Sequence, residues 1–290
     1  MTERPVTVQQ AGPTWQGPPP PEGAAPGLAG WLRALRRGVP LALLMVTGLV
    51  LTLLLRPAER LIWGLRRPVT PWITRAVCRG SLWLLGLPLR VEGQPMRQGG
   101  AIVANHSSWL DILVLNAPAR VYFVSKEEVA SWPGIGWLAR ATGTLFIRRD
   151  RREASAQVAL LGARLRAGHR LVLFPEGTST DGRRVLPFKP TLLAAFAAPG
   201  VETLWLQPAS LAYHAPEGSD PRFYGWWGEM NFGAHLLQVL AQKRQGRVVL
   251  RYHPPQRAGD APNRKVLARA LEEAVRSGLP LAETDQVSAS

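Results

Sequence analysis

Short apolar runs alternate with amphipathic segments from about Leu89 onward. Runs of strand length cover residues 89–91, 101–104, 121–124, 145–147, 171–174, 203–206 and 248–252, and helix-like segments cover 108–116, 152–167, 189–198 and 262–276. Alternation of this kind is typical of an α/β fold. We therefore expect one α/β domain over residues 89–278, with a flexible polar tail over 279–290.

The first 27 residues have a different texture, with seven prolines and few large apolar side chains. Such a segment cannot bury enough apolar surface to fold, so it predicts a disordered tail. A short basic amphipathic piece follows, from Trp31 to Arg37. We assign the tail and this piece together to residues 1–38.

Residues 39–55 form an uncharged run of 17 residues. As a helix this run is about 26 Å long, slightly less than the hydrocarbon thickness of a bilayer. Arginines and tryptophans are interleaved after it, as in helices of the membrane interface. We expect membrane-anchoring or interfacial helices over residues 39–88. The pattern leaves open whether the run crosses the membrane or lies in it, and a buried hairpin helix is an alternative.

The formal net charge of +15, nearly all from arginine, favours anionic partners such as phospholipids or phosphorylated substrates, although an arginine-rich codon preference gives the same balance. Patterns of nucleic-acid-binding domains are missing, so we expect no nucleic-acid partner. The single cysteine, Cys78, excludes an internal disulfide and a cysteine-based zinc site. The histidines are scattered, and we expect no metal site.

Candidate chemistry centres on residues 101–115, AIVANHSSWLDILVL, where a strand-length run ends at His106. Ser107 and Ser108 occupy the expected N-cap of the following helix, and Asp111 falls in its first turn. A carboxylate on one imidazole nitrogen leaves the other free to accept a proton, so His106 is a candidate general base. A hydrogen-bonded core histidine and a helix-start acid are the alternative.

Two further segments offer groups that bind anions. Residues 143–149, GTLFIRR, end a short strand in Arg148 and Arg149, whose guanidinium forks match phosphate oxygens. A solvated basic loop explains this segment equally well.

Residues 171–180, LVLFPEGTST, place a glycine and a hydroxyl after a buried strand. Gly177 allows close approach of an anion, and Thr178 offers a hydrogen bond. Glu176 is expected to face Arg149 or a substrate hydroxyl, because an unpaired acid would repel the anion. Lys189 is a second candidate cation.

Together these blocks resemble the glycerolipid acyltransferase family, which includes bacterial 1-acylglycerol-3-phosphate acyltransferases. The resemblance covers residues 89–252 and rests on four blocks in order: Asn105-His106 with Asp111, residues 143–149, residues 174–178, and residues 207–211 after a strand. It implies a mixed, mostly parallel sheet flanked by helices. Ser179 stands where the family often has an arginine after the third block. A further segment, residues 224–235, is similar to one of bacterial members and either lines the entrance or packs in the core.

The resemblance implies transfer of a fatty acyl group from an acyl thioester to the hydroxyl of a lysophospholipid, most directly 1-acylglycerol-3-phosphate. His106 is then the general base, Asp111 orients it, and Arg149, Glu176, Gly177 and Thr178 bind the acceptor, with Arg148 and Lys189 in support. The donor is acyl-CoA or acyl carrier protein, and no cofactor is implied. Backbone N–H groups at the start of the helix over 108–116 are expected to stabilise the oxyanion.

Two alternatives stay open for the activity. The acceptor is a lyso-ornithine lipid or another lysolipid in the first. The second is a serine hydrolase or thioesterase that uses Ser107, Ser108 or Ser179, although no Gly-x-Ser-x-Gly turn is present. We expect the protein at the bacterial plasma membrane, among membrane phospholipids, with its catalytic domain on the cytoplasmic face.

Overall fold

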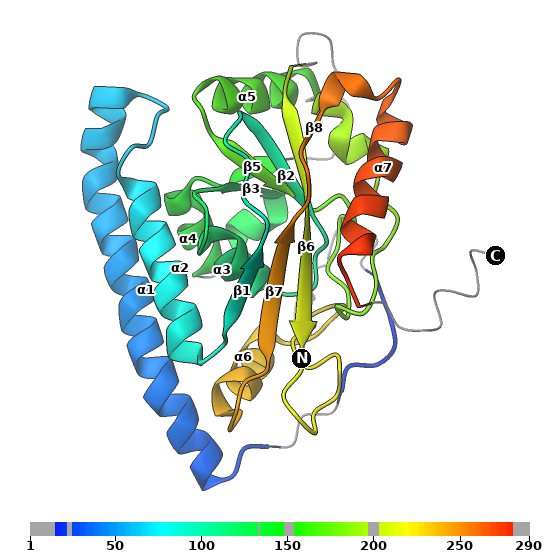
Figure 1. Ribbon diagram of the computed structural model, residues 1–290. Helices are drawn as coiled ribbons and strands as arrows, with labels where there is room; N and C mark the ends of the chain where they lie inside the picture. The colour runs from blue at the N-terminus through cyan, green and yellow to red at the C-terminus, as the bar shows by residue number, and fades with distance from the viewer. Residues whose placement is uncertain (1–14, 22–24, 133, 148–153, 197–202, 281–290) are drawn as a thin grey trace, which may run out of the picture.

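A computed structural model describes residues 15–21, 25–132, 134–147, 154–196 and 203–280. Within them, one sheet of eight strands lies between two groups of helices (Figure 1). The strands are β1 (Leu89–Glu92), β2 (Gly100–Ala104), β3 (Tyr122–Lys126), β4 (Leu145–Ile147), β5 (Arg170–Leu173), β6 (Trp205–His214), β7 (Arg247–Tyr252) and β8 (Gln256–Arg257).

The sheet has the order β1-β7-β6-β2-β5-β3-β4, with β8 beside β6. Pairing is parallel throughout, except that β6 is antiparallel to β7 and to β8. The expected mixed, mostly parallel sheet is thus confirmed. Strand β2 lies between β6 and β5, so the carboxyl ends of three parallel strands meet at one edge, which is where α/β sheets bind ligands.

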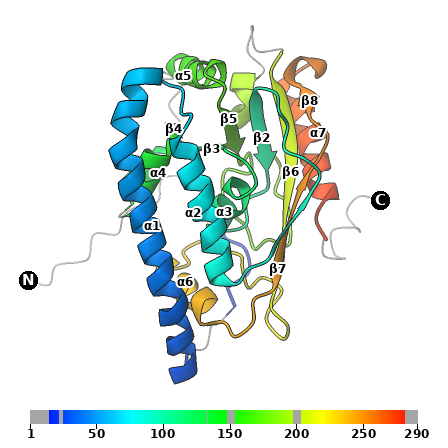
Figure 2. The same cartoon turned by 60° about the vertical axis from the view of Figure 1, so that its left-hand side comes forward.

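The helices are α1 (Leu28–Trp63), α2 (Thr70–Leu85), α3 (Asp111–Asn116), α4 (Ile135–Thr142), α5 (Ala154–Arg166), α6 (Phe232–Ala241) and α7 (Arg264–Ser277). Short 3₁₀ turns cover Glu127–Ser131, Pro190–Phe196 and Ala258–Asp260. Figure 2 shows the antiparallel pair α1 and α2 on one side of the sheet and α7 on the other.

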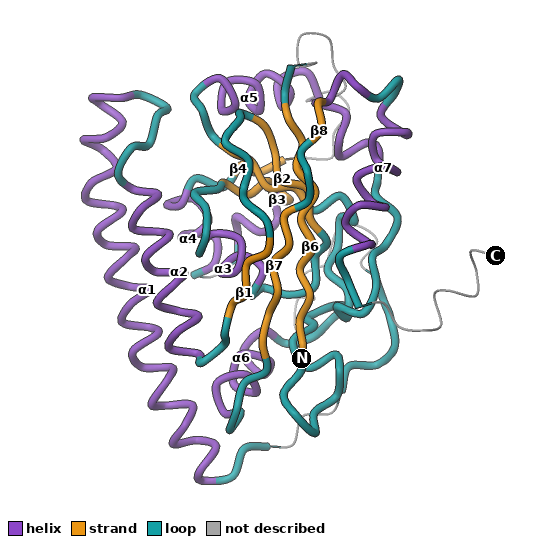
Figure 3. Tube along the Cα trace, viewed as in Figure 1, coloured by secondary structure: helices purple, strands orange, loops and turns teal. Residues whose placement is uncertain are grey.

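Alternate residues of strand β2 belong to two different hydrophobic cores. Ile102 and Ala104 face the core shared with α2, α3 and α6, while Ala101 and Val103 face the core shared with α5 and α7. Strand β2 is fully buried, as expected for a central parallel strand. The tube in Figure 3 shows the strands as the middle layer between helices.

Several elements differ from those predicted from the pattern. The segment expected to be a helix over 189–198 forms the 3₁₀ turn Pro190–Phe196, and the strand expected over 203–206 extends to His214. The block 207–211 therefore lies within β6 and does not follow a strand. Helices α4 and α6 were not among the predicted helices. Both are short and are stabilised by the surrounding fold.

Helix α1 begins at Leu28, so the basic piece expected to belong with the tail is the first part of this helix. The helix has 36 residues and an apolar stretch long enough to cross a membrane. Small residues face its neighbours: a Cβ at Gly48 would overlap Val77 of α2, and a Cβ at Gly80 would lie 2.8 Å from Leu44. Large apolar residues such as Leu43, Leu54 and Leu61 point outward and are exposed.

Both ends of α1 contact the same α/β domain. Near its start, Arg37 donates hydrogen bonds to the carbonyls of Leu240 and Gln242, beside α6. At its end, the connection to α2 reaches α4, where Arg67 donates to the carbonyl of Ala141. The helix therefore lies along the domain over its whole length and does not project from it.

Candidate active site

The imidazole of His106 follows β2 at the carboxyl edge of the sheet. Its Nδ1 lies 2.8 Å from Oδ2 of Asp111. An ionised carboxylate only accepts hydrogen bonds, so Nδ1 carries the proton and Nε2 has a free lone pair. Nε2 has no hydrogen-bond partner in the described part of the chain, and the side chain is 24% exposed. A substrate hydroxyl can therefore reach it.

Asp111 itself is fully buried and has four partners. Its Oδ2 also accepts the N–H groups of Ser107 at 2.8 Å and Ser108 at 3.1 Å, and its Oδ1 accepts the hydroxyl of Tyr213 at 2.6 Å. These bonds fix the carboxylate in the plane that the imidazole needs.

The structure corrects the expected N-cap of this helix and narrows the set of N–H groups available to an oxyanion. Helix α3 begins at Asp111, with Leu110 at its N-cap position, so Ser107 and Ser108 are not caps. Their N–H groups already bind Asp111, so they are not free to stabilise an oxyanion. The N–H groups of this turn instead bind the carboxylate of Asp111 and fix its position.

Glu176 differs most from its expected role. It is 1% exposed, and its two oxygens accept the N–H groups of His106 at 2.7 Å and Leu186 at 2.8 Å. Burial raises the pKa of Glu176 to about 8, against the lowering effect of these two N–H groups. Both of its oxygens are occupied by these backbone N–H groups, and Arg149, its other expected partner, lies outside the described residues. Glu176 holds the backbone of His106 in place.

Backbone hydrogen bonds enclose His106 from other segments as well. Its carbonyl accepts the N–H of Thr180 at 2.9 Å, and the carbonyl of Ser107 accepts the N–H of Trp226 at 2.8 Å. Asn105 binds both the N–H and the carbonyl of Leu211 in β6. The segment over 224–235 therefore packs on the turn that carries His106.

Phe174 sets the plane of the imidazole. Its ring stacks on that of His106 with centroids 4.2 Å apart and planes 14° apart. Phe123 of β3 stacks on Phe174 from behind, at 6.0 Å. Sequence reasoning quoted Phe174 only as part of a motif, and the stacking follows from the adjacency of β5 to β2.

The other predicted binding residues fall into two groups. Gly177 has φ of 72° and turns the chain after β5, a conformation that favours glycine. The hydroxyl of Thr178 accepts the N–H of Trp15 at 3.3 Å, and the N–H of Lys189 donates to Pro175 in the same turn. These three residues lie together beside Glu176. Arg148 and Arg149 lie outside the described residues.

Residues 15–21, expected to belong to a disordered tail, have contacts at this site. The ring of Trp15 lies 6.0 Å from that of Trp227 and under the guanidinium of Arg184, at 5.2 Å. The indole N–H of Trp227 donates to the carbonyl of Pro18. The proline-rich segment therefore crosses the loop that carries Thr178.

The geometry disfavours the serine hydrolase alternative. Ser107 and Ser108 are fully buried, and Ser107 Oγ accepts a hydrogen bond from Asn105. Within the described residues, no serine hydroxyl donates to the ring of His106, as a nucleophile activated by this base would. The imidazole instead points its free nitrogen outward, as required of a base that serves an external alcohol.

Comparison with known proteins agrees with this geometry. The acyltransferase family model matches residues 89–208. A lyso-ornithine lipid O-acyltransferase of Rhodobacter capsulatus is 56% identical over 92% of this chain and 97% of its own length. A 1-acyl-sn-glycerol-3-phosphate acyltransferase of Neisseria gonorrhoeae is 27% identical over 70% of this chain and 78% of its own length.

A similar fold occurs in the crystal structure of the 1-acyl-sn-glycerophosphate (LPA) acyltransferase PlsC from Thermotoga maritima. The TM-score is 0.60 at 21% identity, over 90% of this chain and 97% of that one. The matched region contains both His106 and Asp111, and the similarity to the Rhodobacter relative extends over nearly the full length of both chains. The chain belongs to the acyltransferase family and is an acyltransferase of lysolipids.

Proposed function

We propose that the acceptor is a lyso-ornithine lipid, the alternative raised by the sequence, rather than 1-acylglycerol-3-phosphate. The observation that carries this proposal is the 56% identity to the Rhodobacter lyso-ornithine lipid O-acyltransferase over almost the entire chain. Ser179 gives independent support, because a serine replaces the arginine expected beside an acceptor phosphate. An acceptor whose head group is an amino acid has no phosphate monoester to bind there.

In the proposed reaction, the lipid hydroxyl attacks the carbonyl carbon of an acyl thioester. His106 Nε2 removes the hydroxyl proton as the new ester bond forms, and Asp111 stabilises the resulting imidazolium through Nδ1. The carbon–sulfur bond then breaks, and the imidazolium returns the proton to the departing thiolate. The donor is acyl-CoA or acyl carrier protein, and no cofactor takes part.

An acceptor panel tests the assignment. The full-length protein in micelles is offered lyso-ornithine lipid or 1-acylglycerol-3-phosphate, each with acyl-CoA and with acyl carrier protein. We expect acylation of lyso-ornithine lipid at a kcat/KM at least about tenfold higher than that of the phosphate acceptor, a difference of about 1.4 kcal/mol in transition-state binding. Preference for 1-acylglycerol-3-phosphate with both donors would contradict the proposal.

Replacing the proposed base tests the mechanism separately. His106→Ala should lower kcat at least about 100-fold while the protein stays folded, because general-base assistance contributes that much or more. His214→Ala is a matched control, since His214 lies at the end of β6 and makes no hydrogen bond to His106 or Asp111 in the described structure. Near-normal transfer by His106→Ala would overturn the mechanism whatever the acceptor.

We further propose that α1 anchors the enzyme in one leaflet of the plasma membrane, with the α/β domain on the cytoplasmic face. The support is that both ends of α1 contact one domain while its outer apolar face is exposed. Labelling checks this in a Cys78→Ser background. Leu28→Cys and Arg264→Cys should both react with an impermeant maleimide only in inside-out vesicles, and labelling of Leu28→Cys from outside would show a crossing helix.

A further inference from the structure

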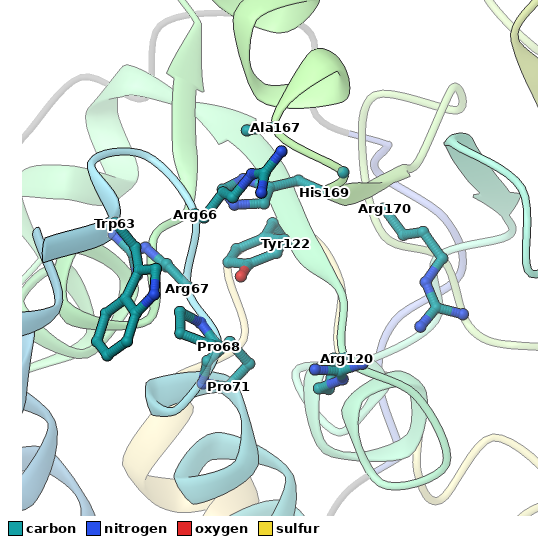
Figure 4. A pocket seen from close by; sticks show the side chains of 11 residues that line it. Trp63, Arg66, Arg67, Pro68, Pro71, Arg120, Tyr122, Ala167, His169 and Arg170 are labelled. Atoms are coloured by element: carbon teal, nitrogen blue, oxygen red, sulfur yellow. The ribbon is translucent and has the colours of Figure 1, made fainter.

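A cavity of about 390 Å³ lies at the edge of the sheet opposite His106. It is formed by the connection between α1 and α2, the start of β3 and the turn before β5 (Figure 4). Arg170 lines the cavity at the first residue of β5, and the last residues of this strand lead to Phe174 beside His106. The length of the strand, about 13 Å, therefore separates the two sites.

Arginines dominate the cavity wall. Arg66, Arg67, Arg120 and Arg170 all line it, and the lining contains no aspartate or glutamate among the residues that the structure describes. Glu59, the carboxylate that acts electrostatically on Arg67, is buried and accepts hydrogen bonds from the N–H groups of Val69 and Thr70. The carboxylate of Glu59 therefore already binds backbone N–H groups at the start of α2. Four guanidinium groups remain around one hollow without an acid in its wall.

The guanidinium groups disturb one another electrostatically. Burial, with Arg56 and Arg164 nearby, lowers the pKa of Arg67 to about 10. Burial and then Arg120 lower the pKa of Arg170. Both groups still carry a charge at neutral pH. An anion in the cavity would relieve this repulsion.

Guanidinium groups without a hydrogen-bond partner also indicate an anionic ligand. Nε of Arg67 is buried and has no partner among the described residues. The guanidinium of Arg66 likewise has no hydrogen bond within the described structure, where only its backbone N–H is paired, whereas the guanidinium of Arg170 donates one to the carbonyl of Met96. Guanidinium forks match the oxygens of a phosphate, so these groups favour a phosphate over a monovalent inorganic ion.

Aromatic rings hold this wall rigid. Tyr122 stacks on His169 with centroids 4.1 Å apart, and the guanidinium of Arg67 lies 5.8 Å from the Tyr122 ring. Arg120 lies over Trp72 of α2, at 4.6 Å. The cationic groups are therefore positioned before any ligand arrives, which lowers the entropy lost on binding.

The cavity opens next to the exposed apolar end of α1. Trp63 lines it and is 46% exposed, and the preceding residues Leu61 and Ile62 are exposed as well. Tryptophan beside aliphatic residues is typical of the depth at which lipid head groups lie. An anion delivered by a lipid surface is thus better placed than one from bulk solution.

From this arrangement we infer that the cavity binds the phosphate of an anionic membrane phospholipid, at a site separate from the catalytic histidine. Binding there seats the end of α1 on an anionic bilayer. The proposal does not depend on the identity of the acyl acceptor.

Thermal unfolding of the full-length protein in zwitterionic micelles tests ligand binding, because a ligand of the folded state raises Tm. Short-chain phosphatidylglycerol should raise Tm, and short-chain phosphatidylcholine, inorganic phosphate and coenzyme A should not raise it through this cavity. Arg66→Gln and the double variant Arg66→Gln/Arg120→Gln should lose the rise. A rise with phosphate or coenzyme A that these variants abolish would overturn the lipid source.

Vesicle binding provides the matched control. Loss of two arginines near an anionic surface should weaken binding to vesicles containing phosphatidylglycerol about 30-fold, from about 1 kcal/mol for each residue. Arg60→Gln/Arg79→Gln removes the same charge from α1 and α2 outside the cavity. An equal loss in both pairs would show general surface attraction and refute a site. His106→Ala should keep the rise in Tm, so failure of the catalytic proposal leaves this test intact.

Discussion

The hydroxyl of Tyr213 donates a hydrogen bond to Oδ1 of Asp111 at 2.6 Å, and both side chains are buried. Asp111 and Tyr213 come from α3 and from the far half of β6. Because Asp111 orients His106, this bond links the antiparallel part of the sheet to the candidate base. We therefore expect Tyr213 to act as a positioning residue, because its buried hydroxyl bonds the carboxylate of Asp111.

Replacing this tyrosine should weaken catalysis without abolishing it. In Tyr213→Phe, Asp111 loses a hydrogen bond of the kind that contributes about 1.5–3 kcal/mol when one partner is charged. If about half of that reaches the transition state, kcat falls about 4- to 13-fold at unchanged acceptor KM. Steady-state kinetics measure kcat and the acceptor KM separately. Tyr224→Phe is the control, since the hydroxyl of Tyr224 binds Gln245 and not Asp111. Equal losses of kcat in both variants would refute the positioning role.

Glu176→Gln should destabilise the protein in a pH-dependent way. A glutamine can accept only one of the N–H groups of His106 and Leu186, at a cost of about 1–3 kcal/mol. The pKa of Glu176 is raised from 4.5 to about 8 in the folded protein. Between these pH values the folded state keeps a proton that the unfolded chain releases, so this group's contribution to stability falls as pH rises.

Glutamine does not titrate, so the free-energy difference between wild type and Glu176→Gln should be largest near pH 5 and smaller near pH 8. Urea unfolding at both pH values measures it. Glu217→Gln, on an exposed loop, should show no such trend. A difference that stayed the same at both pH values would indicate that the buried carboxylate is ionised throughout and would contradict the raised pKa.

Contact between α1 and α2 depends on the absence of a side chain at Gly48. Gly48→Leu would force its side chain against Val77 and separate the helices, at a cost of about 1–3 kcal/mol from overpacking. We expect a lower Tm in micelles. Val50→Leu, on the exposed face of the same helix, should leave Tm within about a degree or two, because it changes no packed contact. A similar effect of both substitutions would argue against close helix packing.

Trp15→Ala should change acceptor binding rather than chemistry. The N–H of Trp15 and its ring hold residues 15–21 across the loop of Thr178, whose hydroxyl the family resemblance assigns to the acceptor. Loss of the ring should loosen this segment and lower the acceptor KM, while kcat stays the same. Steady-state kinetics with lyso-ornithine lipid as the acceptor measure both the KM and kcat of this variant. A higher KM would mean instead that the segment forms part of the acceptor's binding wall.

The sequence by itself determined the elements whose signals are local. The apolar run over residues 101–104 marks a strand because burial on both faces demands continuous apolar side chains. The five-residue spacing of His106 and Asp111 brings them together within a single turn, so their contact was predictable. The four blocks that resemble the glycerolipid acyltransferase family led in addition to the prediction of a mostly parallel sheet.

Only the tertiary structure decided the contacts that depend on which strands are neighbours. Glu176 and Tyr213 lie 70 and 102 positions from the residues they hold, and sheet order alone brings β5 and β6 to the two sides of β2. The arginine cavity likewise needs three distant segments to meet. Hydrophobic periodicity records whether a residue is buried, but not which polar partner satisfies it, so these roles required the folded chain.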